Sequence, residues 1–208
     1  MRWHQAYDDA ANPLIERRHH VVDAVTQSLD AAPPGPLTVV SLCAGDATDL
    51  AIAVGDHPRR GDITGAAVEL DPELARRAVD NFERAGVRLD VRCTDAGDVQ
   101  NSSDLLPVDV LLLVGIFGNV SDADIEQTIG AVPTLCRLGA TIIWTRHRRP
   151  PDLTPRIRAW FEQHGCTHLR FDAPESVSWT VGAERLDHSP AGRPPTGSTR
   201  LFTFLPVA

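Results

Sequence analysis

The chain has 208 residues, of which 42% are hydrophobic and 23% charged, as in a soluble globular domain. Its net charge of −8 argues against a general nucleic-acid binder, and no apolar run approaches the ~20 residues of a membrane span. The four cysteines lie far apart without a C-x-x-C pair, so we expect reduced, buried thiols and no metal site. The first residues lack the apolar segment of a secretory signal, and we expect a cytoplasmic protein.

Residues 13–31 carry apolar side chains at helical spacing and predict a leading amphipathic helix, which Pro33 and Pro34 end. The segment ahead of this helix holds Trp3, His4 and Tyr7 among polar residues. It is either a lid whose rings contact a substrate or a disordered tail. We therefore divide the chain into an N-terminal segment, 1–36, and a main domain, 37–208.

The centre of the sequence pattern is the stretch VVSLCAGDATDL, residues 39–50. An apolar strand from Leu37 ends in small residues, and a helix is predicted from Asp49 to Val54. Backbone amides at the start of such a helix can be approached closely because the side chains are small. The turn at residues 43–47 is therefore a candidate nucleotide-binding turn. The alternative is a purely structural role, since many α/β proteins have such a turn and bind nothing there.

The strand and helix pattern then repeats along the chain. Asp71 and Pro72 are suited to cap and begin a helix, which Gly86 ends. Residues 108–114 are almost entirely Val and Leu, which is typical of a parallel strand buried on both faces. Further strands are predicted at residues 63–70, 87–93, 140–145, 168–171, 176–186 and 200–205, and further helices at 122–135 and 153–161.

This order predicts an α/β fold with a doubly wound, mostly parallel sheet of seven strands and helices on both faces. The last strands have no helix between them, so we expect an antiparallel C-terminal hairpin at one edge. Residues 190–198 are rich in Pro and Gly and predict a surface loop.

Two carboxylates follow the next strands, at the sheet edge where ligands bind in open α/β folds. Glu69 lies 24 positions after Gly45, which is typical of an acid that accepts hydrogen bonds from ribose hydroxyls. Its alternative role, capping a helix, is already filled by Asp71. Asp95 is suited to accept from an adenine amino group, with a neighbouring backbone amide donating to the ring. The alternative is that Asp95 caps the helix that starts near Asp98.

The fourth and fifth strands end at the same edge. Residues 115–119, GIFGN, place two glycines around Phe117, which gives a flat ligand or substrate access to backbone. Phe117 is alternatively a core residue. Arg146 and His147 close the fifth strand; Arg146 could orient an anionic acceptor, and histidine titrates near neutrality. A solvated surface position is the alternative for both.

Together these motifs resemble the class I methyltransferases that use S-adenosylmethionine, over residues 37 to about 165. In this resemblance SLCAGDA stands for the glycine-rich cofactor loop, VELDPE supplies Glu69, and TDA supplies Asp95. The segment LLLVGIFGNVSDAD faces cofactor and substrate, and RLGATIIW leads into the fifth strand. Cys43 and Ala47 replace two usual glycines, and Ser41 replaces the usual acid. RWHQAYD and TRHRRPPDLTPRIRAWF resemble an uncharacterised bacterial branch and imply no substrate.

The resemblance implies S-adenosylmethionine as cofactor and in-line methyl transfer. We expect a small-molecule acceptor, because the compact size argues against a large polymeric substrate. It implies cofactor contacts at Cys43, Ala44, Gly45, Asp46, Ala47, Glu69, Leu70, Asp95, Ala96 and Gly115. The substrate is expected at Trp3, His4, Tyr7, Phe117, Asn119 and Arg146. A general base is needed only for a protonated acceptor, and we favour His147 over His4 and Asp122 because the fifth strand ends at the pocket.

Two other functions fit parts of the pattern. A nicotinamide-dependent oxidoreductase requires G-x-G-x-x-G, and Cys43 to Thr48 supply only one glycine. A protein that binds the adenosyl cofactor without catalysis is compatible with every motif. We expect no nucleic-acid or membrane partner, and the sequence does not determine the oligomeric state.

Overall fold

The computed structural model describes residues 12–188 and 200–206. Trp3, His4 and Tyr7 lie outside the described residues, so their predicted contact with a substrate stays a prediction. The leading helix is present as α1 (Pro13–Ala31), where Asn12 caps the first turn by accepting from the Leu14 amide at 3.0 Å. Within the described part of the chain, no helix is long and apolar enough to cross a membrane.

The strands form one seven-stranded sheet in the order β3-β2-β1-β4-β5-β7-β6. β1 to β5 are parallel, and β7 pairs antiparallel with both β5 and β6. The predicted fold class is therefore confirmed. An antiparallel C-terminal hairpin is also present, but β6 and β7 form it, whereas it was expected from residues 176–186 and 200–205. The strands are β1 (Leu37–Leu42), β2 (Ile63–Glu69), β3 (Asp90–Cys93), β4 (Val108–Leu113), β5 (Cys136–His147), β6 (Cys166–Asp172) and β7 (Trp179–Leu186).

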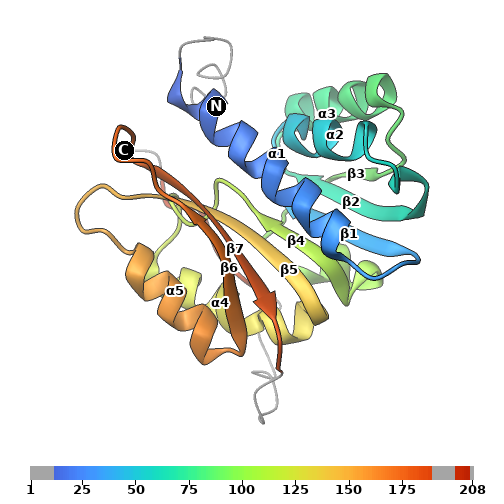
Figure 1. Ribbon diagram of the computed structural model, residues 1–208. Coiled ribbons are helices and arrows are strands. Elements are labelled where there is room, and N and C mark those ends of the chain that lie inside the picture. Colours follow the sequence, from blue (N-terminus) through green and yellow to red (C-terminus); the bar gives the residue numbers. More distant parts are fainter. Residues whose placement is uncertain (1–11, 189–199, 207–208) are drawn as a thin grey trace.

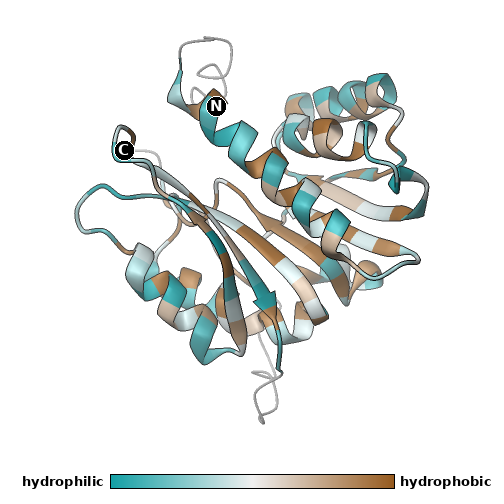
Figure 2. Ribbon diagram, in the orientation of Figure 1, coloured by the Kyte–Doolittle hydropathy of each residue, from teal (hydrophilic) through white to brown (hydrophobic). Residues whose placement is uncertain are grey.

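Helices cover both faces of this sheet (Figure 1). α1, α2 (Thr48–Gly55) and α3 (Pro72–Ala85) pack on one face, and α4 (Asp122–Leu135) and α5 (Thr154–Gln163) on the other. Apolar residues follow the central strands, between the two helical layers (Figure 2). Two short 3-10 helices, η2 (Arg60–Asp62) and η3 (Val99–Leu105), precede β2 and β4. The leading helix α1 contributes buried residues to the same core as α2 and α3.

The C-terminal segment differs from the prediction. Residues 200–205 were expected to form a strand, but they make only isolated bridges, one between Arg200 and Asp98 and one between Phe204 and Val120. The amides of Leu201 and Leu205 donate to the carbonyls of Gly97 and Asn119 instead of to a strand. The segment therefore crosses loops at the carboxyl ends of the strands, and we call residues 200–205 the C-terminal strap.

Candidate functional site

The turn between β1 and α2 has an alternating left-handed backbone. The φ angle is 54° at Cys43, 61° at Gly45 and 49° at Ala47. Left-handed φ is uncommon for residues other than glycine. Cys43 and Ala47 therefore keep the backbone conformation that glycine usually provides, and the tight predicted turn is present.

The Glu69 side chain at the end of β2 fixes this turn. Its Oε2 accepts a hydrogen bond from the Gly45 amide at 2.8 Å, and its Oε1 accepts from the Asp71 amide at 2.9 Å. Asp71 caps α3 by accepting from the amides of Glu73 and Leu74, as predicted. A carboxylate offers about four lone-pair sites, so Glu69 has acceptor capacity left for a ligand.

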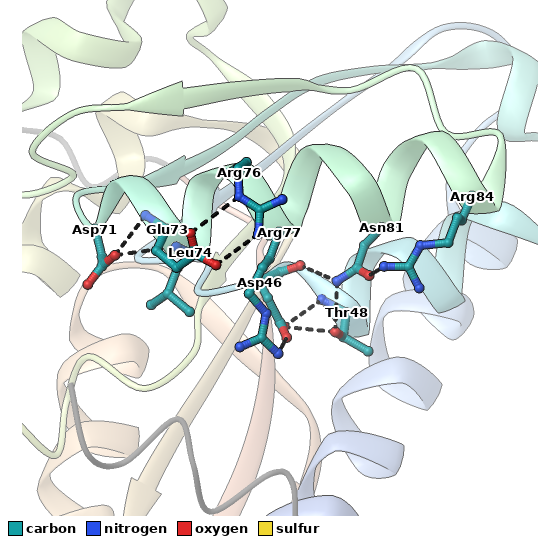
Figure 3. Close-up of polar contacts among 9 residues, drawn as sticks. All are labelled: Asp46, Thr48, Asp71, Glu73, Leu74, Arg76, Arg77, Asn81 and Arg84. Carbon is teal, nitrogen blue, oxygen red and sulfur yellow. Dashed lines mark hydrogen bonds and ion pairs between the residues drawn. The ribbon is translucent and has the colours of Figure 1, made fainter.

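A second anchor for the turn comes from α3 and was not predicted from the sequence (Figure 3). The Asn81 side chain donates to the Asp46 carbonyl at 2.8 Å and to the Thr48 hydroxyl at 3.2 Å. The Asp46 carboxylate accepts from the Thr48 amide and hydroxyl, and Arg77 lies 3.4 Å from its other oxygen. Helix α3 therefore orients the loop in addition to Glu69 of β2.

A cavity of about 380 Å³ lies over the ends of β2 and β3, and we call it the first cavity. Six of its lining residues are predicted cofactor contacts, and two are phenylalanines of the C-terminal strap that the sequence did not indicate. Its lining residues are Cys43, Glu69, Leu70, Asp71, Pro72, Leu74, Asp95, Ala96, Gly115, Phe202 and Phe204.

Asp95 lines this cavity but is already engaged within the chain. One carboxylate oxygen accepts from the Gly97 amide at 2.8 Å, and the other lies 2.6 Å from the guanidinium of Arg200. The helix η3 is capped by Asp98, whose carboxylate accepts from the Gln100 amide. Asp95 therefore is not the cap of that helix, and it also ties the C-terminal strap to the sheet edge.

A smaller second cavity of about 50 Å³ lies between the turn and α1. Ser41, Cys43, Ala44, Gly45 and Asp46 line it together with Arg17, Arg18 and Asp49. Asp49 accepts from the Leu50 amide at 2.8 Å, and burial raises the pKa of its carboxyl group. Asp49 thus brings a carboxylate to the cavity where Ser41 replaces the usual acid. Ala47 is fully buried. It lines neither of these two cavities, nor the larger cavity beyond the ends of β4 and β5.

A third cavity of about 640 Å³ lies beyond the ends of β4 and β5, and we call it the acceptor cavity. Asn119, Arg146 and His147, three predicted site residues, line it. Gly115, whose amide donates to the Thr145 hydroxyl at 2.8 Å, lines all three cavities. The cavities therefore meet at the end of β4.

The side chain of Phe117 does not take part in this site. It is fully buried and packs near the rings of Trp144 and Phe161, with centroids 6.1 and 6.5 Å away. The structure therefore supports the core alternative and not a substrate contact. Its carbonyl accepts a hydrogen bond from the Arg146 guanidinium. Gly118 lies directly beside His147, since a Cβ there would be in van der Waals contact with the imidazole, 3.4 Å from its Cδ2.

His147 lies in a positive, partly buried setting. Burial lowers the pKa of its imidazole, and the charges of Arg146 and Arg149 lower it further. Its Nδ1 has no hydrogen-bond partner among the described residues. The lowered pKa favours the neutral imidazole, which is the form that can accept a proton.

We expect the pKa of His147, measured by NMR titration, to lie below the usual value for histidine. Arg149→Gln should raise this pKa because it removes a nearby positive charge. Arg88→Gln is the control, since Arg88 is an exposed arginine before β3, at the amino end of the sheet. A His147 pKa at or above the usual value, or one that Arg149→Gln does not raise, contradicts this description of the site.

Several residues that line the cavities were not predicted from the sequence. Arg17, Arg18 and Asp49 line the second cavity, and Arg149 and residues 176–179 line the acceptor cavity. These residues come from elements that only the tertiary fold brings together. A weak signal for Arg149 was present in the basic run at residues 146–149.

Comparison with models of protein families gave no match, and comparison with curated protein sequences gave none either. Comparison with solved structures gave many. An O-methyltransferase family protein from Burkholderia thailandensis matches with a TM-score of 0.64 and 18% identity, over 81% of this chain and 56% of that one.

The carbon methyltransferase CurJ matches with a TM-score of 0.60 and 12% identity, over 77% of this chain and 51% of that one. The cyclase SpnF matches with a TM-score of 0.61 and 11% identity, over 81% of each chain. The chain thus spans about half the length of the two methyltransferases. At these identities the likeness shows the fold, which methyltransferases and a cyclase share.

Proposed function

We propose that this chain binds S-adenosylmethionine and transfers its methyl group to a small-molecule acceptor. The observation that carries the proposal is the meeting of the three cavities at Gly115, together with Glu69, which lines the first cavity and binds the turn. The fold of the methyltransferase neighbours supports it.

The residues of the first two cavities fit this cofactor. Glu69 has acceptor capacity for ribose hydroxyls, and Leu70 and Phe204, which are exposed by 66% and 43%, offer apolar surface to an adenine ring. Asp49 and the arginines of α1 offer opposite charges to a zwitterionic amino-acid end. The Asp95 carboxylate would accept a hydrogen bond from the adenine amino group, either while it stays paired with Arg200 or with the amino group in place of Arg200.

When bound, S-adenosylmethionine supplies an electrophilic methyl group, and positioning an acceptor against it contributes on the order of 7–11 kcal/mol. The end of β4 at Gly115 and the end of β5 at Arg146 hold the acceptor side. For a protonated acceptor, we propose that His147 takes the proton, since its lowered pKa keeps it neutral.

Isothermal titration with S-adenosylmethionine, S-adenosylhomocysteine and NADH tests the cofactor. We expect both adenosyl compounds to bind and NADH not to bind. Binding of NADH alone overturns the proposal. Methyl transfer from labelled S-adenosylmethionine to a metabolite panel then separates an enzyme from a binding protein without catalysis. Cofactor binding without transfer across the panel favours the binding protein.

A further inference from the structure

The acceptor cavity has an unusual charge distribution. Every charged side chain that lines it among the described residues is basic, namely Arg17, Arg146 and Arg149, and His147 lies beside them. No Asp or Glu lines it within that part of the chain. The whole chain has a net charge of −8, so this positive lining is a local feature and not part of a generally basic surface.

Arg146 is the central cation of this cavity. It is half-buried at the end of β5, and its guanidinium donates to the Phe117 carbonyl. Its buried Nε has no hydrogen-bond partner among the described residues, and burial lowers its pKa. The carboxylates of Asp122 and Asp152 raise that pKa by their charge, yet neither lines the cavity. A partly desolvated cation that lines a cavity favours an anionic partner.

The remaining lining suits a small organic molecule. Asn119, Ser176 and Ser178 bring neutral polar side chains, and Pro13, Leu14 and Val177 bring apolar ones. The volume of about 640 Å³ lies within the range of small-molecule sites, which is roughly 300–1,000 Å³. The cavity thus has an apolar part and a cationic part.

On the basis of the proposed methyl transfer, we propose that the acceptor is a small organic anion whose carboxylate or phosphate group is bound by Arg146 and Arg149. The guanidinium fork matches the paired oxygens of either group. The anionic group then orients the acceptor, and its uncharged part lies against the apolar wall. Arg149 is exposed and lines the cavity, so its charge also attracts the anion from solution.

The test is calorimetric titration of the full chain with benzoate, phenyl phosphate and neutral benzamide, with and without S-adenosylhomocysteine. We expect at least one anion to bind about 10-fold or more tightly than benzamide, since hydrogen bonds to charged groups carry that difference. Arg146→Gln and Arg149→Gln should each weaken the anion by about 10-fold or more, and added salt should weaken it further. Arg88→Gln is the matched control, with the same change of charge and no expected effect.

The comparison of benzoate with phenyl phosphate identifies the preferred anionic group. Arg146→Gln removes a hydrogen bond to the Phe117 carbonyl and can therefore disturb folding. In that case Arg149→Gln still tests the proposal, because Arg149 is exposed. Equal binding of benzamide, no binding of either anion, or unchanged affinity in Arg149→Gln overturns the proposal. Failure of S-adenosylhomocysteine to bind counts against the proposed function instead, and the titrations without it still measure the anion site.

Discussion

Replacing Glu69 with alanine is expected to weaken binding of S-adenosylhomocysteine by about 10- to 150-fold, or roughly 1.5–3 kcal/mol, the usual contribution of hydrogen bonds to a charged group. Glu69 is only 9% exposed and its two oxygens each already accept one backbone amide. The carboxylate is therefore held in place before a ligand binds. Such pre-organisation makes its hydrogen bonds to ribose hydroxyls more favourable, because little entropy is lost on binding.

The same substitution is expected to lower the free energy of unfolding by about 1–3 kcal/mol, because the buried amide of Gly45 loses its acceptor. Chemical denaturation measures this loss. The weaker binding then has two sources, the missing ribose contact and a less fixed turn.

A thermodynamic cycle separates these two sources. An S-adenosylhomocysteine analogue without the 2′ and 3′ hydroxyls should bind more weakly to the wild type, and Glu69→Ala should weaken it further only by the part that comes from the less fixed turn. Glu73→Ala is the matched control, since Glu73 is an exposed acid of α3 that pairs with Arg76 and lines none of the three cavities. If Glu69→Ala weakens the analogue as much as the natural compound, Glu69 acts only through the turn.

The alternation of strands and helices was sufficient to predict the sheet, because buried parallel strands such as β4 read as continuous apolar runs. The residues that begin and end a helix could also be predicted from the local sequence. Asp71 begins α3, and Gly86 ends it with a φ of 66°. Glu69 could be placed because parallel strands end at one edge, so that a residue after β2 lies beside the turn after β1.

The C-terminal strap could not be predicted in the same way. Its residues are mostly apolar, with two phenylalanines and a threonine, a composition typical of a strand. The local sequence does not show that Leu201 and Leu205 pair with loops. The apolar wall that Phe202 and Phe204 give the first cavity depends on that long-range pairing.

Two further features also depend on tertiary context. Glu184 lies in β7 and is fully buried, where its carboxylate accepts from the Trp144 indole at 3.1 Å and contacts His168. Burial raises the pKa of Glu184, and nothing in the sequence distinguishes it from an exposed strand acid. The left-handed φ of Cys43 and Ala47 could not be predicted either, since residue type alone predicts a right-handed or extended backbone there.

Gly65→Ala is expected to reduce the free energy of unfolding by about 2–6 kcal/mol, from backbone strain of roughly 1–3 kcal/mol and overpacking of a similar size. Gly65 lies within β2 with a φ of +134°, and a Cβ there would lie 1.8 Å from the Val39 carbonyl oxygen. Val39 cannot move away, because it pairs with Gly65 on one side and with Val110 of β4 on the other. Chemical denaturation measures the loss.

Gly61→Ala is the matched control, since Gly61 has no left-handed φ and a Cβ there would meet no atom within 4 Å. It should change stability by less than about 0.5 kcal/mol. Wild-type stability in Gly65→Ala would contradict the strand packing described here. The pairing at Gly65 also fixes the site, because the same β1–β2 register brings Val68 opposite Leu42 and so places Glu69 within hydrogen-bond distance of Gly45. If Gly65→Ala folds by separating these strands, S-adenosylhomocysteine should bind it more weakly than the wild type, although no cavity residue has changed.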